Sequence, residues 1–270
     1  MTATTQTVRD IALENPASVR VFEKYGIDYC CGGRMPLAQA CANRNLNLDE
    51  VMASLKGAAG LLVPEGPDWS LESLASLATH ITETHHAYIR RELPRLYELA
   101  AKVVRRHGDT RQELPAIQVK LSELGEELIS HLGKEEVVLF PYISKLEQYM
   151  TGNGPQPRNC FGSVSHPIAM MTQEHDLAGD LMGQIRKLSG NYAPPEGACP
   201  TYLGFYQALS EFGRDLRRHV HLENNILFPR AIELEVSPIR TSRAGTDEAP
   251  ARSRSAASRL SASHSQPLFG

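Results

Sequence analysis

Four long segments of this chain repeat apolar residues at alternating spacings of three and four, which is typical of a helix face that packs against a core. In chain order they cover residues 70–96, 117–138, 168–185 and 202–226, and Ser70 can cap the first helix. We expect connections of about 10–17 residues between the four helices. We therefore expect an all-α protein built on an antiparallel four-helix bundle.

Histidine and glutamate interrupt these apolar faces at matched positions. His131 and Glu135 stand four residues apart, and His219 and Glu223 repeat the pair 88 residues later. Four residues are about one helical turn, so both side chains of a pair lie on one helix face. A buried carboxylate without a partner costs several kcal/mol, so its place on a core face needs a reason. The repeated pairs favour a metal site inside the bundle.

Single histidines on the other two helices complete a donor set of four imidazoles and two carboxylates. The candidate metal ligands are His86, His131, Glu135, His175, His219 and Glu223. The two carboxylates can bridge two ions, two histidines can complete each ion, and one oxo or hydroxo bridge would leave each ion an open position. Imidazole and carboxylate at such a site suit iron better than manganese or zinc. The sequence thus predicts two Fe ions in a non-haem di-iron centre.

The ligand on the first helix is ambiguous from spacing alone, because His85 and His86 are adjacent. On an ideal helical wheel, His85 lies nearer the centre of the apolar face than His86 does. Spacing slightly favours His85 and leaves both residues open.

Composition divides the 270 residues into four parts: a helical N-terminal domain over 1–58, a Gly- and Pro-rich linker over 59–69, the bundle over 70–236, and a basic Ser/Arg/Ala tail over 237–270. In the N-terminal domain, Thr7 can cap a first helix, a second can end at Gly26, a third can start at Pro36, and Asn47 or Asp49 can start a fourth. The tail has almost no large apolar residues, so we expect it to be disordered.

Charge and hydropathy exclude several classes of protein. The 28 basic and 31 acidic side chains give a net charge of -3, which disfavours a nucleic-acid binder held by phosphate contacts. No stretch approaches 18 consecutive apolar residues, so we expect no membrane span. The N-terminus lacks the pattern of a signal peptide and the cysteine count is odd, which favours a cytoplasmic protein with reduced thiols.

The chain resembles a known family, the di-iron proteins for repair of iron–sulfur clusters (the YtfE, ScdA and DnrN group, with NorA as a relative). The segment Ile-Asp-Tyr-Cys-Cys-Gly-Gly at 27–33 resembles the signature of its ScdA-type N-terminal domain. Residues 70–234 are similar to its hemerythrin-like domain, with Leu-Phe-Pro at 139–141 and again at 227–229 and Pro-Pro-Glu-Gly-Ala-Cys at 194–199. The resemblance selects His86, because the family's ligand stands eight residues before the proline that is Pro94 here.

The resemblance implies a cytoplasmic stress protein that repairs iron–sulfur clusters damaged by nitric oxide or peroxide, by donating iron from a labile di-iron site. Its partners would be damaged iron–sulfur proteins, with nitric oxide or oxygen as a small ligand, and the chain could form a homodimer. Two alternatives stay open: nitric oxide binding or reduction at the same site, and a hemerythrin-like oxygen or iron sensor. Whether the protein is an enzyme is therefore open. A ferritin-like oxidase is disfavoured, because the pairs are His-x3-Glu and not Glu-x-x-His.

The vicinal thiols Cys30 and Cys31 are candidate catalytic residues. The glycines that follow them allow a close turn, which would leave both thiols exposed before the helix that starts at Pro36. The helix N-terminus and Arg34 would lower the pKa of a thiol. Such a pair could bind iron, accept nitrosyl or form a disulfide, functions that a simple oxygen carrier does not need.

Overall fold

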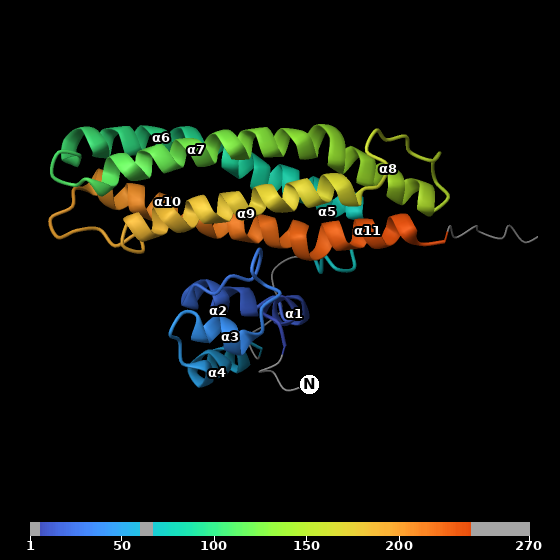
Figure 1. The fold of residues 1–270 in the computed structure, drawn as a ribbon, viewed down its shortest axis with the longest axis horizontal. Coiled ribbons are helices and arrows are strands. Elements are labelled where there is room, and N and C mark those ends of the chain that lie inside the picture. Colours follow the sequence, from blue (N-terminus) through green and yellow to red (C-terminus); the bar gives the residue numbers. More distant parts are fainter. Residues whose placement is uncertain (1–5, 60–66, 239–270) are drawn as a thin grey trace, which may run out of the picture. The chain divides into compact units, whose positions relative to one another are not determined.

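The computed structural model describes residues 6–59 and 67–238, and within these ranges every regular element is a helix (Figure 1). The single β-bridge described joins Thr7 and Pro36. The predicted all-α class is confirmed. Most of the predicted linker and nearly all of the predicted tail lie outside the described residues. None of the described helices combines the length and the hydropathy that a membrane crossing requires.

The N-terminal part contains α1 (Val8–Glu14), α2 (Ser18–Tyr25), α3 (Leu37–Ala42) and α4 (Leu48–Ala59). Thr7 caps α1 by accepting the backbone N–H of Asp10 at 3.1 Å, as predicted. Gly26 ends α2 with a φ of 68°, a left-handed conformation that glycine adopts without strain. Asn47, and not Asp49, precedes α4 as its cap, because its side chain accepts the N–H of Asp49 at 2.9 Å.

Four long helices make up the larger part, and π-helical turns interrupt three of them. The first comprises α5 (Leu74–His80), η1 (Ile81–His86) and α6 (Ala87–His107). The second comprises α7 (Glu113–Lys134), η2 (Glu135–Leu139) and α8 (Phe140–Met150). The third is α9 (Ser165–Leu188), and the fourth comprises α10 (Pro200–Leu222), η3 (Glu223–Leu227) and α11 (Phe228–Val236).

The first long helix differs from the prediction at both ends. Ser73, and not Ser70, is the N-cap of α5, and its hydroxyl accepts the N–H of Ser76 at 3.0 Å. The helix continues beyond Leu96 to His107, so only residues 108–112 connect it to α7. The expected connection length was wrong here, because buried residues such as Val103 extend the apolar face by three further turns.

Two apolar clusters divide the bundle core, and together they show the direction of each helix. Cluster A contains, among others, Leu96, Leu121, Ile185 and Leu209, and cluster B contains Leu77, Ile143, Ile168 and Phe228. The first and third long helices pass from cluster B to cluster A, and the second and fourth pass from A to B. Neighbouring helices in the chain therefore run antiparallel, as expected (Figure 1).

The π-helical turns lie where cluster A meets cluster B. His86 is the last residue of η1, Glu135 is the first of η2, and Glu223 is the first of η3. Pro141 and Pro229 stand in the first turn of the α-helices that follow η2 and η3, and neither has an N–H to continue the α-helical ladder. Insertions of this kind are frequent at functional sites.

Candidate metal centre

All six predicted ligands converge between cluster A and cluster B, in two groups that share both glutamates. The first group is His86, Glu135, His219 and Glu223; the second group is His131, Glu135, His175 and Glu223. Within each group, one ligand atom from every residue lies within 4.8 Å of the others, and all of these residues are buried. Four donors at this separation could hold one metal ion in each group.

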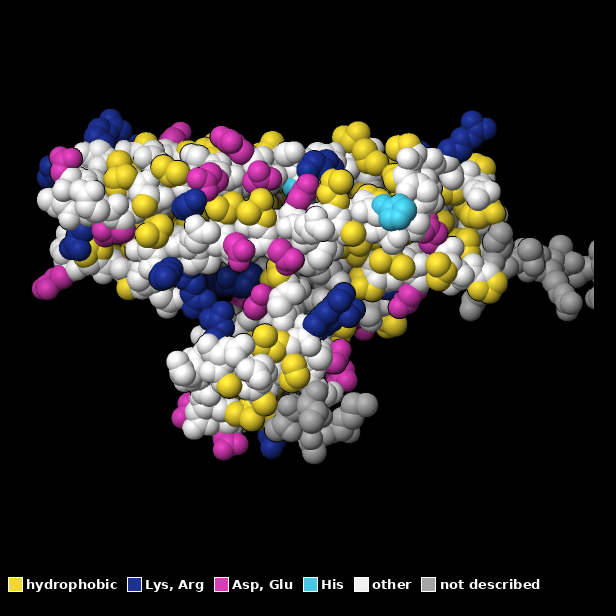
Figure 2. All heavy atoms as spheres, in the orientation of Figure 1, with side chains coloured by type: hydrophobic (Ala, Val, Ile, Leu, Met, Phe, Trp, Pro, Cys, Tyr) yellow, Lys and Arg dark blue, Asp and Glu magenta, His cyan; other side chains and the backbone are white. Residues whose placement is uncertain are grey.

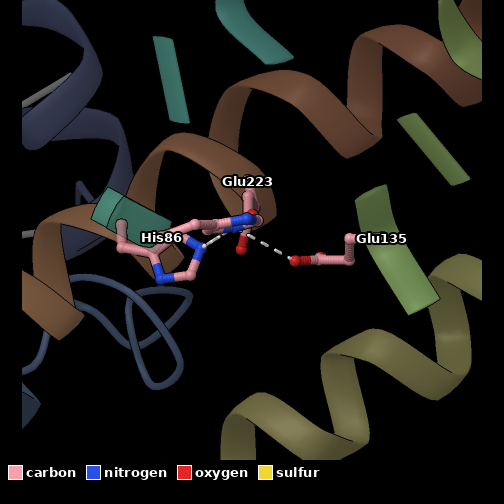
Figure 3. A group of neighbouring side chains, drawn as sticks. His86, Glu135 and Glu223 are labelled. Atoms are coloured by element: carbon pink, nitrogen blue, oxygen red, sulfur yellow. Dashed lines mark hydrogen bonds and ion pairs between the residues drawn. The ribbon is translucent and has the colours of Figure 1, made fainter. Parts of the chain in front are cut away.

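The two carboxylates connect the groups. Figure 3 shows the side chains of His86, Glu135 and Glu223 turned toward one another. Oε2 of Glu135 lies 3.5 Å from His86 Nε2 in the first group and 3.3 Å from His131 Nε2 in the second. Glu223 presents one oxygen to each group.

The two oxygens of Glu223 separate clearly in their contacts. Oε1 lies 2.9 Å from His219 Nε2, and Oε2 lies 3.0 Å from His175 Nε2. A carboxylate with its oxygens directed at two different imidazoles has the placement that a bridging ligand needs.

The donor set fits iron on a physical ground. Glu135 is fully buried, and neither of its oxygens accepts a hydrogen bond from the described residues. A buried carboxylate left in that state is costly, whereas a cation with nitrogen and oxygen ligands satisfies it. Imidazole and carboxylate together match iron, and a structural zinc site would instead favour thiolates or a closed tetrahedron.

The site also holds its carboxylates ionised. Burial and the charge of Glu223 oppose ionisation of Glu135, but the imidazoles of His131 and His86 outweigh them and hold the pKa of Glu135 below its usual value. Burial likewise opposes a charge on His86, yet the two shared carboxylates outweigh it and raise the pKa of His86 to about 10. Without a metal, the raised pKa of His86 favours its protonated form, which offsets part of the negative charge of the two carboxylates.

Outer hydrogen bonds orient two of the histidines through carboxylates. His86 Nδ1 lies 2.7 Å from Glu136 Oε1, and Arg90 pairs with that carboxylate at 2.7 Å. His131 Nδ1 lies 2.9 Å from Glu174 Oε2. The carboxylate of Glu174 is in turn held by Lys134. An ionised carboxylate accepts the Nδ1 proton, which leaves the Nε2 lone pair directed at the candidate metal position.

The other two histidines have weaker outer contacts. His175 Nδ1 lies 2.9 Å from the amide oxygen of Asn224. His219 Nδ1 is buried and has no hydrogen-bond partner among the described residues. The four imidazoles are thus held unequally.

The structure places His86, and not His85, in the first group. His86 is fully buried with its Nε2 3.1 Å from His219 Nε2, while His85 Nδ1 pairs with Asp215 at 3.0 Å. The ideal helical wheel favoured the wrong histidine because η1 is π-helical. A π-helical turn contains about one residue more than an α-helical turn, which rotates the following side chains about the helix axis. Ligation by His86 stays a prediction.

The Cys-Cys-Gly-Gly loop folds around Asp28. Its carboxylate accepts the backbone N–H groups of Cys30, Cys31 and Gly32 at 2.9, 3.1 and 2.9 Å. The amides that could have formed an anion site therefore already bind a carboxylate of the same loop.

The sequence predicted exposed thiols with a lowered pKa, and both predictions are wrong for Cys30. Cys30 is buried and packs with cluster A, while Cys31 is only partly exposed. The hydrogen bond with Cys31, burial and the charge of Asp28 raise the pKa of the Cys30 thiol well above its usual value. The helix dipole and Arg34 do not prevail: Cys30 Sγ donates a hydrogen bond to Asp28 Oδ1 at 3.2 Å, which favours the protonated thiol.

The thiol loop contacts the helices that carry the candidate ligands. Both parts belong to one compact unit of the chain. Cys31 Sγ lies 3.8 Å from the backbone oxygen of His175, and Asn225 donates its side-chain N–H to the backbone oxygen of Tyr29 at 2.9 Å. Sequence reasoning did not predict these contacts, and no periodicity signals them.

Sequence reasoning also missed the outer partners of the histidines. Glu136, Glu174 and Asn224 are each adjacent to a candidate ligand. They do not belong to the apolar pattern of their helices, so that pattern did not identify them as functional residues. No periodicity signals this role: each stands one residue from a ligand, but on a neighbouring helix from the histidine it contacts.

The fold and the buried histidine–glutamate groups define a hemerythrin-type cation-binding protein. The family described as "Hemerythrin HHE cation binding domain" matches residues 77–231, and a second family, ScdA_N, described as a domain of unknown function (DUF542), matches residues 4–59.

Curated relatives specify the family further. An iron–sulfur cluster repair protein YtfE from Yersinia pseudotuberculosis is 36% identical over 230 residues, covering 85% of this chain and 98% of the relative. A YtfE from Escherichia coli O81 is 39% identical over 227 residues, covering 84% and 96%. The chain belongs to the YtfE family of iron–sulfur cluster repair proteins, which confirms the resemblance seen in the sequence.

Proposed function

We propose that the six converging side chains hold two iron ions, with Glu135 and Glu223 shared between them. The observation that carries this proposal is the pair of four-residue groups with both carboxylates in common. The buried, unsatisfied oxygens of Glu135 support it, since two cations would satisfy them. An oxo or hydroxo bridge would complete the centre.

When bound, iron at these positions supplies redox chemistry and a coordination position for a small ligand such as nitric oxide or oxygen. The chain's own residues hold and shield it. Glu136 and Glu174 retain the Nδ1 protons of His86 and His131, so that Nε2 can donate to the metal. Cluster A and cluster B place apolar side chains on both sides of it.

We further propose that the protein repairs iron–sulfur clusters damaged by nitrosative or oxidative stress, by donating iron from this centre. The relatives support this proposal: they are named iron–sulfur cluster repair proteins, and the chain matches them over nearly their whole length. Damaged iron–sulfur proteins are then its partners. A cytoplasmic location agrees with the five cysteines, which are all unpaired thiols.

Reactivation of a damaged enzyme tests this function. An aconitase-type cluster is damaged with nitric oxide and then incubated anaerobically with the iron-loaded protein. We expect recovery of activity with wild type, and little with Glu135→Ala or with an equal amount of free ferrous iron. Equal recovery in all three would contradict a specific repair role.

The thiol pair is tested in the same assay. The double variant Cys30→Ala, Cys31→Ala should keep its iron, because the bundle supplies every proposed ligand. If the small domain carries iron or nitrosyl to a client, the variant should nevertheless reactivate the damaged enzyme less than wild type at equal iron loading. Equal reactivation would show that the thiols are dispensable and would favour nitric oxide binding or reduction.

A further inference from the structure

A cavity of about 930 Å³ opens beside the thiol loop; it reaches His175, a candidate iron ligand, and extends beyond it along α9 and α10. The thiol loop contributes Cys31, α9 contributes Gly183 and Arg186, and α10 contributes Arg217. Figure 2 shows dark-blue Lys and Arg side chains gathered in a hollow at the edge of the bundle. The volume is that of a small-molecule site.

Basic side chains converge on one end of this cavity. The lining includes Arg44, Arg186, Lys187 and Arg217. Within the described part of the chain, none of the four forms an ion pair with a carboxylate. Burial and the nearby charges of Arg44 and Arg217 lower the pKa of Arg186. Like charges held together in this way repel one another, and a bound anion would remove that repulsion.

The guanidinium of Arg186 is held in place by its surroundings. Its Nε donates to the side-chain oxygen of Asn191 at 2.6 Å. Its terminal nitrogens lie against Gly26, where a Cβ atom would come within 2.8 Å of Nη2. Gly26 therefore makes room for the arginine, and a fixed guanidinium is well suited to bind a carboxylate.

The opposite end of the cavity is acidic and carries the thiol. Asp176 and Asp180 stand one turn apart on α9 and line this end, as does Asp28, whose carboxylate is occupied by its own loop. A Cβ on Gly179 would lie 3.8 Å from Cys31 Sγ. One turn further along α9, a Cβ on Gly183 would meet nothing within 4 Å, so the helix surface is open there.

The two ends have a definite separation. From Gly179 to Arg186 the helix rises about 10 Å at 1.5 Å per residue. An extended tripeptide spans about the same length. A ligand of this length, with carboxylates at one end and an ammonium group at the other, matches both ends of the cavity in charge.

We propose that this cavity binds a short zwitterionic peptide with at least two carboxylates, held by Arg44, Arg186 and Arg217. Its ammonium end lies toward Asp176 and Asp180 and covers Cys31. Such a ligand would control access to the thiol pair. The binding does not require iron.

Calorimetry on the full-length protein tests the site with the tripeptide Gly-Gly-Glu, which has its ammonium group at one end, two carboxylates at the other end and no thiol. We expect saturable binding to one site, weakened roughly tenfold or more in the double variant Arg186→Gln, Arg217→Gln. The matched control is Arg105→Gln, Arg106→Gln, which removes the same charge from exposed positions at the end of α6. It should bind as wild type does.

Alkylation of Cys31 gives a second measurement. In wild type the peptide should slow labelling of Cys31 by iodoacetamide, followed by mass spectrometry, and in the arginine double variant it should not. Absence of saturable binding, or equal binding by the double variant and wild type, overturns the proposal. Inorganic phosphate binding as tightly as the peptide also overturns it, since the site would then select only negative charge.

A blocking variant keeps the test independent of the arginines' role in folding. Gly183→Phe places a side chain into the open space, and replacing a helical glycine does not oppose folding. We expect it to abolish peptide binding. Gly204→Phe on α10, where the space is also open, is its control and should bind normally. Normal binding by Gly183→Phe would contradict the location of the site.

Discussion

The first and second groups of the candidate metal centre share both carboxylates but differ in what holds their histidines. In the second group, both imidazoles have an Nδ1 hydrogen bond, to Glu174 and to Asn224. In the first group only His86 has one, and the Nδ1 of His219 is buried without a partner in the described chain. The internal repeat of 88 residues therefore produced similar ligands in unequal settings.

This difference bears on how iron would be released. A hydrogen bond from Nδ1 to an acceptor fixes the ring and makes Nε2 a better donor, and losing one typically costs 10–100-fold in metal affinity. We expect the ion in the first group, with His219 unsupported, to bind more weakly than the ion in the second. On the proposed function, the ion of the first group would then be the one that is donated.

The largest effect should come from a shared carboxylate. Glu223→Ala removes a ligand from both groups, so we expect nearly complete loss of iron, measured by elemental analysis of anaerobically purified protein. Glu127→Ala, exposed on α7, is the control and should keep its iron. Glu136 is unsuitable as a control because it contacts His86. Full iron content in Glu223→Ala would refute the shared site.

A smaller loss of iron should distinguish His86 from His85, the adjacent histidines of η1. His86→Ala removes a ligand from the first group only, so about one of two ions should be lost. His85→Ala breaks the pair with Asp215 outside both groups and should leave the iron count and the di-iron absorption largely unchanged. The reverse result would show that the helical wheel was the better guide.

A substitution outside the ligands should reduce the difference in binding strength between the two ions. Glu174→Gln replaces the charged acceptor of the His131 proton with a neutral one, so the second ion should bind roughly 10-fold or more weakly. The rate of iron removal by a chelator measures this. We expect the two ions to leave at more similar rates than in wild type. An unchanged ratio of rates would mean that the outer hydrogen bonds do not set the difference.

The smallest effect is expected at Asn224. Asn224→Ala removes a neutral hydrogen bond from His175, which is weaker than a bond to a carboxylate. The second ion should then leave the protein only a few times faster in the same chelator assay. An effect larger than that of Glu174→Gln would reverse the ranking of the two contacts.

The sequence predicted the bundle and the residues that converge in it because both follow from helical period. Spacing alone puts His131, Glu135, His219 and Glu223 on the apolar faces of their helices, and the structure brings these residues together. The ideal α-helical period did not identify which of His85 and His86 lies in the first group. No proline marks η1 as Pro141 and Pro229 mark the other two π-helical turns, so its extra residue could not be seen in the sequence.

Contacts between helices were beyond the sequence. Glu174 reaches His131 across 43 positions. This contact depends on how separate helices meet, and it leaves no periodic trace. For the same reason the thiol loop's contact with His175 emerged only from the folded chain.

Iron counting with Mössbauer spectroscopy on anaerobically purified, full-length protein tests the central claim most directly. The two groups predict about two irons per chain, in two doublets of equal area and different parameters, because the histidines of the two groups are held differently. One iron per chain, or two irons in a single doublet, would contradict an unequal centre built on the shared carboxylates of Glu135 and Glu223.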